Sequence, residues 1–124
     1  MTRHPGLEDD LFINDGMLTK KEVRAITLSA LQPYPGSLLW DVGAGSGSVG
    51  IEWMRLSPRS LAIAIEEDVD RAATIAKNAN HLGTPKLQVI NAHAPECLLS
   101  LPRPNAIFIG GGIATKDLFD QCWE

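Results

Sequence analysis

Residues 38–50, Leu-Leu-Trp-Asp-Val-Gly-Ala-Gly-Ser-Gly-Ser-Val-Gly, decide the fold of this 124-residue chain. Residues 38–42 are apolar except for Asp41, which is typical of a buried parallel strand. Glycines then alternate with small residues before a helical pattern begins. This order predicts a strand that turns sharply into a helix, with glycines that let a ligand approach the main chain. We expect the helix N-terminus behind this glycine loop to offer free N–H groups.

Two classes of ligand are compatible with the glycine loop, and a tight turn without a ligand is a third possibility. Gly45-x-Gly47-x-x-Gly50 satisfies the dinucleotide pattern G-x-G-x-x-G. Glu66 follows Gly45 at roughly the spacing of ~20 residues that is expected of an acid that binds the ribose. Asp41 weighs against a dinucleotide, because a carboxylate two residues before the glycines would repel a pyrophosphate. It suits a ligand with a cationic part, such as an amino-acid ammonium beside a sulfonium.

Composition narrows the class of protein. With 44% hydrophobic and 21% charged residues, the chain reads as one ordinary soluble domain at most, residues 1–124. A net charge of −4 disfavours a nucleic-acid partner, whose phosphates need clustered Lys and Arg. The sequence contains neither a membrane span nor a signal peptide, so we expect a cytoplasmic protein with no membrane partner. Two distant cysteines, Cys97 and Cys122, and scattered histidines predict no metal site.

The N-terminal part is predicted to be an irregular arm followed by a helix. Residues 1–18 combine Gly and Pro with a small apolar anchor, so they are either an arm that covers a site or pairs with another subunit, or a loosely packed terminus. Residues 19–32 form the leading helix, with Thr19-Lys20-Lys21-Glu22 as a capping box and Pro33 as its stop. Its expected apolar face is Val23, Ile26, Thr27, Ala30 and Leu31.

Strands alternate with helices along the rest of the chain. Residues 61–65, 86–90 and 106–109 are the further strands, the second of them more polar and nearer the sheet edge. Such alternation predicts a parallel α/β sheet in the order 3-2-1-4 with right-handed crossovers. The fourth strand would then expose a long apolar edge, so we expect a longer domain. The expected apolar face of the helix between the second and third strands is Ala72, Ile75, Ala76, Ala79 and Leu82.

Three further positions lie where open α/β sheets bind ligands, at the carboxyl ends of strands. Glu66 could accept both ribose hydroxyls of a nucleoside, or it could be a solvated acid at a helix start. His93 or the backbone of Ala94 could meet an adenine edge, or His93 could be a loop residue without a role. Residues 110–112, three glycines, either let a bulky ligand pass or form a flexible turn.

These motifs together closely resemble the CobL/CbiT family of corrin-pathway methyltransferases, in particular the CbiT-like C-terminal domain of precorrin-6Y C5,15-methyltransferases (decarboxylating). The glycine loop is shared by many methyltransferases, but Gly-x-Leu-Thr-Lys and Ile-Gly-Gly-Gly are more particular to this family. The resemblance spans nearly the whole chain, and it is carried by residues 15–20, 39–49, 94–95 and 106–112.

The resemblance implies the class I, Rossmann-like methyltransferase fold, a three-layer sandwich of which the last three of seven strands are absent here. It further implies methylation of carbon 15 of a precorrin, with decarboxylation of the acetate on carbon 12, in cobalamin biosynthesis. Family members assemble as tetramers, and a second methyltransferase domain can be fused upstream. The implied cofactor is S-adenosylmethionine, which we expect to contact Thr19, Asp41, Gly43, Ala44, Gly45, Ser46, Gly47, Glu66, His93 and Ala94.

The substrate side of the expected site is less specific. A precorrin bears many carboxylates, so we expect basic residues at a helix N-terminus, Lys20, Lys21 and Arg24, to contact it; a solvated charged face is the alternative. Gly110, Gly111 and Gly112 would leave room for the macrocycle. We name no catalytic residue, because aligning carbon, methyl and sulfur is the main task of this chemistry. A nicotinamide-dependent oxidoreductase and a non-catalytic ligand-binding module remain competing functions.

Overall fold

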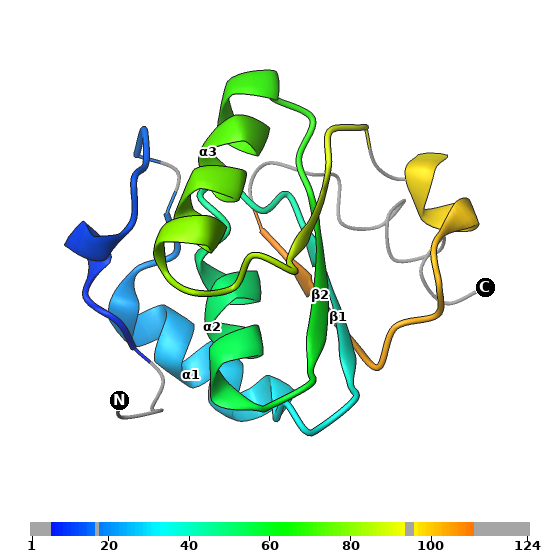
Figure 1. Ribbon diagram of the computed structural model, residues 1–124, viewed down its shortest axis with the longest axis horizontal. Coiled ribbons are helices and arrows are strands. Elements are labelled where there is room, and N and C mark those ends of the chain that lie inside the picture. The colour runs from blue at the N-terminus through cyan, green and yellow to red at the C-terminus, as the bar shows by residue number, and fades with distance from the viewer. Residues whose placement is uncertain (1–5, 17, 94–95, 111–124) are drawn as a thin grey trace.

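The computed structural model describes residues 6–16, 18–93 and 96–110, which form a parallel sheet flanked by helices (Figure 1). The strands pair in the order β3-β2-β1-β4, and every pair is parallel. This confirms the predicted 3-2-1-4 order, with β3 at an edge. The third strand is shorter than expected and begins at Gln88 rather than Lys86. The elements are η1 (Asp9–Leu11), α1 (Lys21–Leu31), β1 (Leu38–Val42), α2 (Ser48–Leu56), β2 (Leu61–Ile65), α3 (Val69–His81), β3 (Gln88–Ile90), η2 (Glu96–Ser100) and β4 (Ala106–Ile109).

Alternation along β1 and β2 sends side chains to two separate cores. Leu39 joins the cluster beneath α1, α2 and α3, all of which lie on one side of the sheet in Figure 1. The neighbouring Trp40 joins the second cluster, on the side where η2 lies. The sheet is therefore covered on both faces, as its apolar strands require. Apart from Trp40, the buried members of the second cluster are Val42, Ile63, Ile65 and Leu98.

The leading helix differs from its prediction in both its cap and its face. Helix α1 begins at Lys21 with Lys20 as N-cap, and no side chain caps it, so the predicted capping box is wrong. The predicted apolar face is wrong as well, because Val23 and Ile26 are exposed. The inward face instead carries Leu28 and a fully buried arginine, Arg24, for which apolar periodicity offers no signal.

Helix α3 also buries a polar residue that was not part of its predicted face. Ala72, Ile75 and Ala79 pack inward as predicted, but Ala76 is exposed and Asn78 is fully buried. Asp68 caps the helix by accepting hydrogen bonds from the N–H groups of residues 70 and 71. The inward face of α3 is thus rotated towards Asn78.

The N-terminal arm extends to Lys20, because α1 begins at Lys21 and not at residue 19 as predicted. Its described residues, 6–16 and 18–20, pack against the helical side of the sheet. Phe12 is its apolar anchor and is 3% exposed. The arm then returns towards the glycine loop, where Gly16 and Leu18 line a cavity. Of the two predicted alternatives, the packed Phe12 and this cavity lining favour an arm that covers a site over a loosely packed terminus. None of the helices in the described ranges has the length and apolar character needed to cross a membrane.

Candidate ligand-binding site

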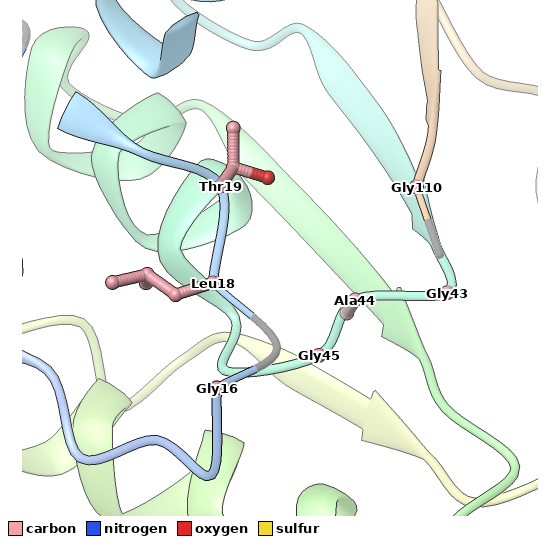
Figure 2. A pocket seen from close by; sticks show the side chains of 7 residues that line it. All are labelled: Gly16, Leu18, Thr19, Gly43, Ala44, Gly45 and Gly110. Atoms are coloured by element: carbon pink, nitrogen blue, oxygen red, sulfur yellow. The ribbon is translucent and has the colours of Figure 1, made fainter. Parts of the chain in front are cut away.

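A cavity of about 180 Å³ lies at the carboxyl end of β1, between the arm and the glycine loop. Figure 2 shows that its lining comes from three separate segments: the arm, the loop after β1, and the residue after β4. Five of the predicted site residues line it together: Thr19, Gly43, Ala44, Gly45 and Gly110. Sequence reasoning assigned no ligand contact to the other two lining residues, Gly16 and Leu18. Their signal was present in the motif at residues 15–20.

The amides of the glycine loop are largely used within the chain, and at the start of α2 the Gly50 N–H is taken by Asp41. The amides of Gly43 and Ala44 both donate to the carbonyl of Ile65, at 2.9 and 3.2 Å. The Gly47 amide donates to the carbonyl of Ala44 at 2.9 Å. A phosphate-binding loop instead turns its amides towards the anion. The loop geometry therefore disfavours a pyrophosphate, and with it the dinucleotide interpretation.

Glu66 lies at the carboxyl end of β2, is 5% exposed, and holds the loop in place. Its Oε1 accepts the Gly45 N–H at 2.9 Å, and its Oε2 accepts the Asp68 N–H at 3.0 Å. Two carboxylate oxygens together offer about four lone-pair positions, so capacity remains for a ligand's hydroxyls. Glu66 is thus next to the cavity wall and is no solvated helix-start acid.

Asp41 does not line the cavity, which corrects its expected direct contact with a cationic ligand. Its carboxyl group is 1% exposed and lies beneath α2, where Oδ2 accepts the Gly50 N–H at 3.1 Å. Oδ1 is buried without a hydrogen-bond partner among the described residues. Burial raises the pKa of Asp41 to about 7; the Gly50 hydrogen bond opposes this shift, and the charge of Glu66 adds to it. Asp41 therefore supports the start of α2 from below.

Ser46 and Gly47 shape the loop without lining the cavity. Ser46 is buried, and its carbonyl accepts a hydrogen bond from the Asn78 side chain at 2.9 Å. Gly47 has a φ of +82°, and a Cβ built there would come within 2.7 Å of Ile75 Cγ2. A glycine is required at this position both by its conformation and by its close approach to α3.

The structure contradicts the prediction that Arg24 contacts a substrate. Its guanidinium group is fully buried in an ion pair with Glu52, and it donates to the carbonyls of Thr19 and Leu7. It also lies over the Phe12 ring, 4.7 Å from the centroid. Nη2 also lies 3.3 Å from Asp9 Oδ1, so this buried cation is directed at the arm and does not line the cavity. Lys20 and Lys21 are the more accessible basic residues, and Lys21 pairs with Glu8 at 2.6 Å.

The remaining predicted site residues lie apart from the cavity or outside the described residues. His93 is exposed and pairs through Nδ1 with the Glu67 carboxylate, so its side chain is not in the cavity lining. Ala94, Gly111 and Gly112 lie outside the described residues. Within the described ranges, no group of three or more His, Cys, Asp or Glu side chains could hold a metal ion.

Sequence reasoning missed the polar residues that position the site. Glu52 accepts the amides of Gly6 and Leu7 through Oε1, at 2.8 and 3.1 Å. Asn78 hydrogen-bonds both to Ile13 in the arm and to Ser46 in the loop. Neither Glu52 nor Asn78 belonged to a predicted inward face, so apolar periodicity gave no signal for them.

Comparison with known proteins identifies close relatives. A family model described as a precorrin methyltransferase domain matches residues 10–124. The chain is 57% identical over 119 residues to a precorrin-6Y C(5,15)-methyltransferase (decarboxylating) of Sinorhizobium, and 40% identical over 116 residues to the protein of the same name from Mycobacterium tuberculosis. The structure superposes on the C-terminal domain of precorrin-6Y C5,15-methyltransferase from Rhodobacter capsulatus with a TM-score of 0.90 and 44% identity.

The matches cover nearly all of this chain but a smaller share of each relative. The two sequence matches cover 96% and 94% of this chain but 29% of each relative. The Rhodobacter match covers 99% of this chain and 66% of that one. The chain therefore spans less than a third of the length of these two curated relatives.

Proposed function

The chain belongs to the precorrin methyltransferase family, and we propose that it binds the methyl donor of an enzyme of cobalamin biosynthesis. In that reaction carbon 15 of a precorrin is methylated, and the acetate chain on carbon 12 loses carbon dioxide. The observation that carries the proposal is the cavity built jointly by the arm and the glycine loop. The chain that forms it is 57% identical to the Sinorhizobium precorrin-6Y C(5,15)-methyltransferase (decarboxylating).

S-adenosylmethionine is the donor that the residues around the cavity fit. The lining is mostly main chain and glycine, with Thr19 as its polar side chain. A Cβ at Gly110 would approach Gly43 O to 3.3 Å, so the space depends on small residues. At about 180 Å³ the cavity is smaller than the ~300 Å³ at which whole-ligand pockets begin, so it accommodates one part of the donor. We assign the acceptance of hydrogen bonds from the ribose hydroxyls to Glu66, which holds Gly45 of the lining.

The chain's own residues contribute positioning rather than proton transfer. Bound S-adenosylmethionine supplies a methyl group activated on a sulfonium. The loop and the arm hold this donor in one orientation, which lowers the entropy cost of bringing the reacting atoms into line. Thr19 and Glu66 are the side chains that we assign to its binding. Lys20 and Lys21 remain our assignment for the carboxylates of a precorrin substrate.

Titration with S-adenosylhomocysteine tests this proposal. We expect the protein to bind it with a micromolar or lower Kd and to bind NAD at least about 100-fold more weakly, measured by calorimetry. Glu66→Gln should weaken binding about tenfold, because a neutral amide accepts ribose hydroxyls less strongly. Glu67→Gln is the matched control, since that side chain is exposed and pairs with His93 instead. Equal affinity for the two ligands would refute the proposal.

The assembly around this chain remains a prediction. The Sinorhizobium and Mycobacterium relatives are more than three times as long as the matched region, which supports a partner methyltransferase domain in the same protein. A homotetramer is what the family resemblance implies. Methyl transfer to a precorrin by the intact protein, followed by mass spectrometry, would establish both the added methyl group and the lost carbon dioxide.

A further inference from the structure

Asn78 makes hydrogen bonds to two segments that lie far apart in the sequence, the arm and the glycine loop. Its Nδ2 donates to Ile13 O at 2.8 Å and to Ser46 O at 2.9 Å. Its Oδ1 accepts the Ile13 N–H at 2.8 Å. The side chain is fully buried on α3, so it bridges the arm and the glycine loop from inside the molecule.

The carboxamide side chain of Asn78 suits this bridge better than an aspartate or a leucine side chain would. A buried amide is costly unless its polar atoms are paired, and here both donor hydrogens and the acceptor have partners. A carboxamide presents a donor and an acceptor side by side, which matches the N–H and C=O of one backbone residue such as Ile13. An aspartate would lack the donors, and a leucine would lack both functions.

Besides the ion pair between Asp15 and Arg71 of α3 at 3.0 Å, two buried side chains anchor the arm segment that forms a cavity wall. Asn78 holds the segment at Ile13, and Arg24 holds it at Thr19, whose carbonyl accepts a hydrogen bond from Nη1 at 2.6 Å. Between these anchors lie Gly16 and Leu18, which line the cavity (Figure 2). The spacing between this wall and the opposite wall at Gly43–Gly45 therefore depends on Asn78, which contacts both the segment and the loop.

We propose that Asn78 is a positioning residue for the methyl donor, since it sets the distance between the arm and the glycine loop. The inference rests on the proposed function, because it assumes that the donor occupies this cavity. Asn78 does not line the cavity and acts through the backbones of Ile13 and Ser46.

Donor affinity and stability, measured side by side, test this role in the intact protein. Asn78→Ala should raise the Kd of S-adenosylhomocysteine and the KM of S-adenosylmethionine about tenfold, with kcat changed less than about twofold. Asn78→Ser, which keeps one donor and one acceptor, should recover part of the affinity. Ser60→Ala is the matched control. Ser60, directly before β2, is also buried, and its hydroxyl donates to two carbonyls, Trp53 O and Ser57 O. This substitution should lower the Tm without changing the Kd.

Hydrogen exchange of the wild-type protein gives a second measurement that needs no variant to fold. Saturating S-adenosylhomocysteine should slow exchange of the Ile13 amide, which bonds Asn78 and lies outside the cavity lining. Unchanged exchange at Ile13 on binding, or unchanged affinity in both Asn78 variants, would overturn the positioning role alone. Failure of the wild-type protein to bind the probe would overturn the proposed function itself.

Discussion

The two faces of the sheet bury different kinds of side chain. On the helical face, the charged Arg24 and Glu52 and the amide Asn78 are fully or almost fully buried among the apolar residues. The cluster on the opposite face contains Trp40, Val42, Ile63, Ile65 and Leu98. The polar groups of the helical face bind main-chain atoms of the arm and the loop, which have irregular backbone to satisfy. The cluster on the opposite face packs strands against η2 mainly through apolar contacts, with one side-chain hydrogen bond from Trp40 to the Pro102 carbonyl.

The two faces differ in how precisely they fix the segments packed on them. Apolar packing is non-directional and cannot fix a loop to within hydrogen-bonding distance. Buried hydrogen bonds are directional, and leaving one unmade is costly. The polar anchors lie on the face against which the arm packs, and the arm lines the cavity, so substitutions on the two faces should have separable effects on stability and binding.

Arg24→Ala should give the largest effect. Removing one partner of a buried ion pair leaves Glu52 uncompensated and should cost about 3–5 kcal/mol of unfolding free energy, with weaker binding of S-adenosylhomocysteine because the arm loses its anchor at Thr19. Ile63→Ala on the opposite face should cost a similar amount, about 2–5 kcal/mol, with unchanged affinity. Chemical unfolding and calorimetry measure the two quantities. Equal loss of affinity in both variants would contradict the separation of the faces.

Gly47→Ala should follow in size. The new Cβ must occupy the left-handed region and meet Ile75 Cγ2 at 2.7 Å, which together should cost about 2–4 kcal/mol and displace the loop. Gly36→Ala is the matched control, because Gly36 has a φ of +85° but no neighbouring atom within 4 Å of the place that an added methyl group would take. It should cost about 1–2 kcal/mol. If thermal unfolding shows equal losses, contact with α3 does not constrain the loop.

Asp41→Asn should give the smallest effect, and one that depends on pH. The unfolded chain releases this proton near the ordinary pKa of 3.8, whereas the folded chain releases it only near pH 7. Folding stability from Asp41 is therefore fully present at low pH and is lost as the pH rises from about 4 to 7. Relative to wild type, the asparagine variant should gain at least about 1.4 kcal/mol between pH 4 and pH 8.

Urea unfolding at the two pH values measures this difference for Asp41→Asn. Asp10→Asn, at an exposed position in the arm, controls for the general loss of one negative charge. A gain in stability that is the same at pH 4 and pH 8 would show that ionisation of Asp41 does not oppose folding on the helical face.

Local patterns in the sequence determined the parallel strands, the sheet order and the loop at residues 43–47. These features follow from apolar runs and glycine spacing, which act over short distances along the chain. The same patterns placed Gly43–Gly45 and Glu66 near one another, because carboxyl ends of parallel strands share one edge, whereas Thr19 was expected there only from the family resemblance.

Only the tertiary structure decided what the polar residues do. Arg24 was expected to face a substrate and is buried with Glu52, Asp41 was expected to face a ligand and lies under α2, and Asn78 drew no expectation at all. A charge or amide on a helix is ordinarily solvated, and its burial depends on partners 28 to 65 residues away in the chain. No local pattern carries that information, because the hydrogen bonds form only when the arm, the loop and the helices meet.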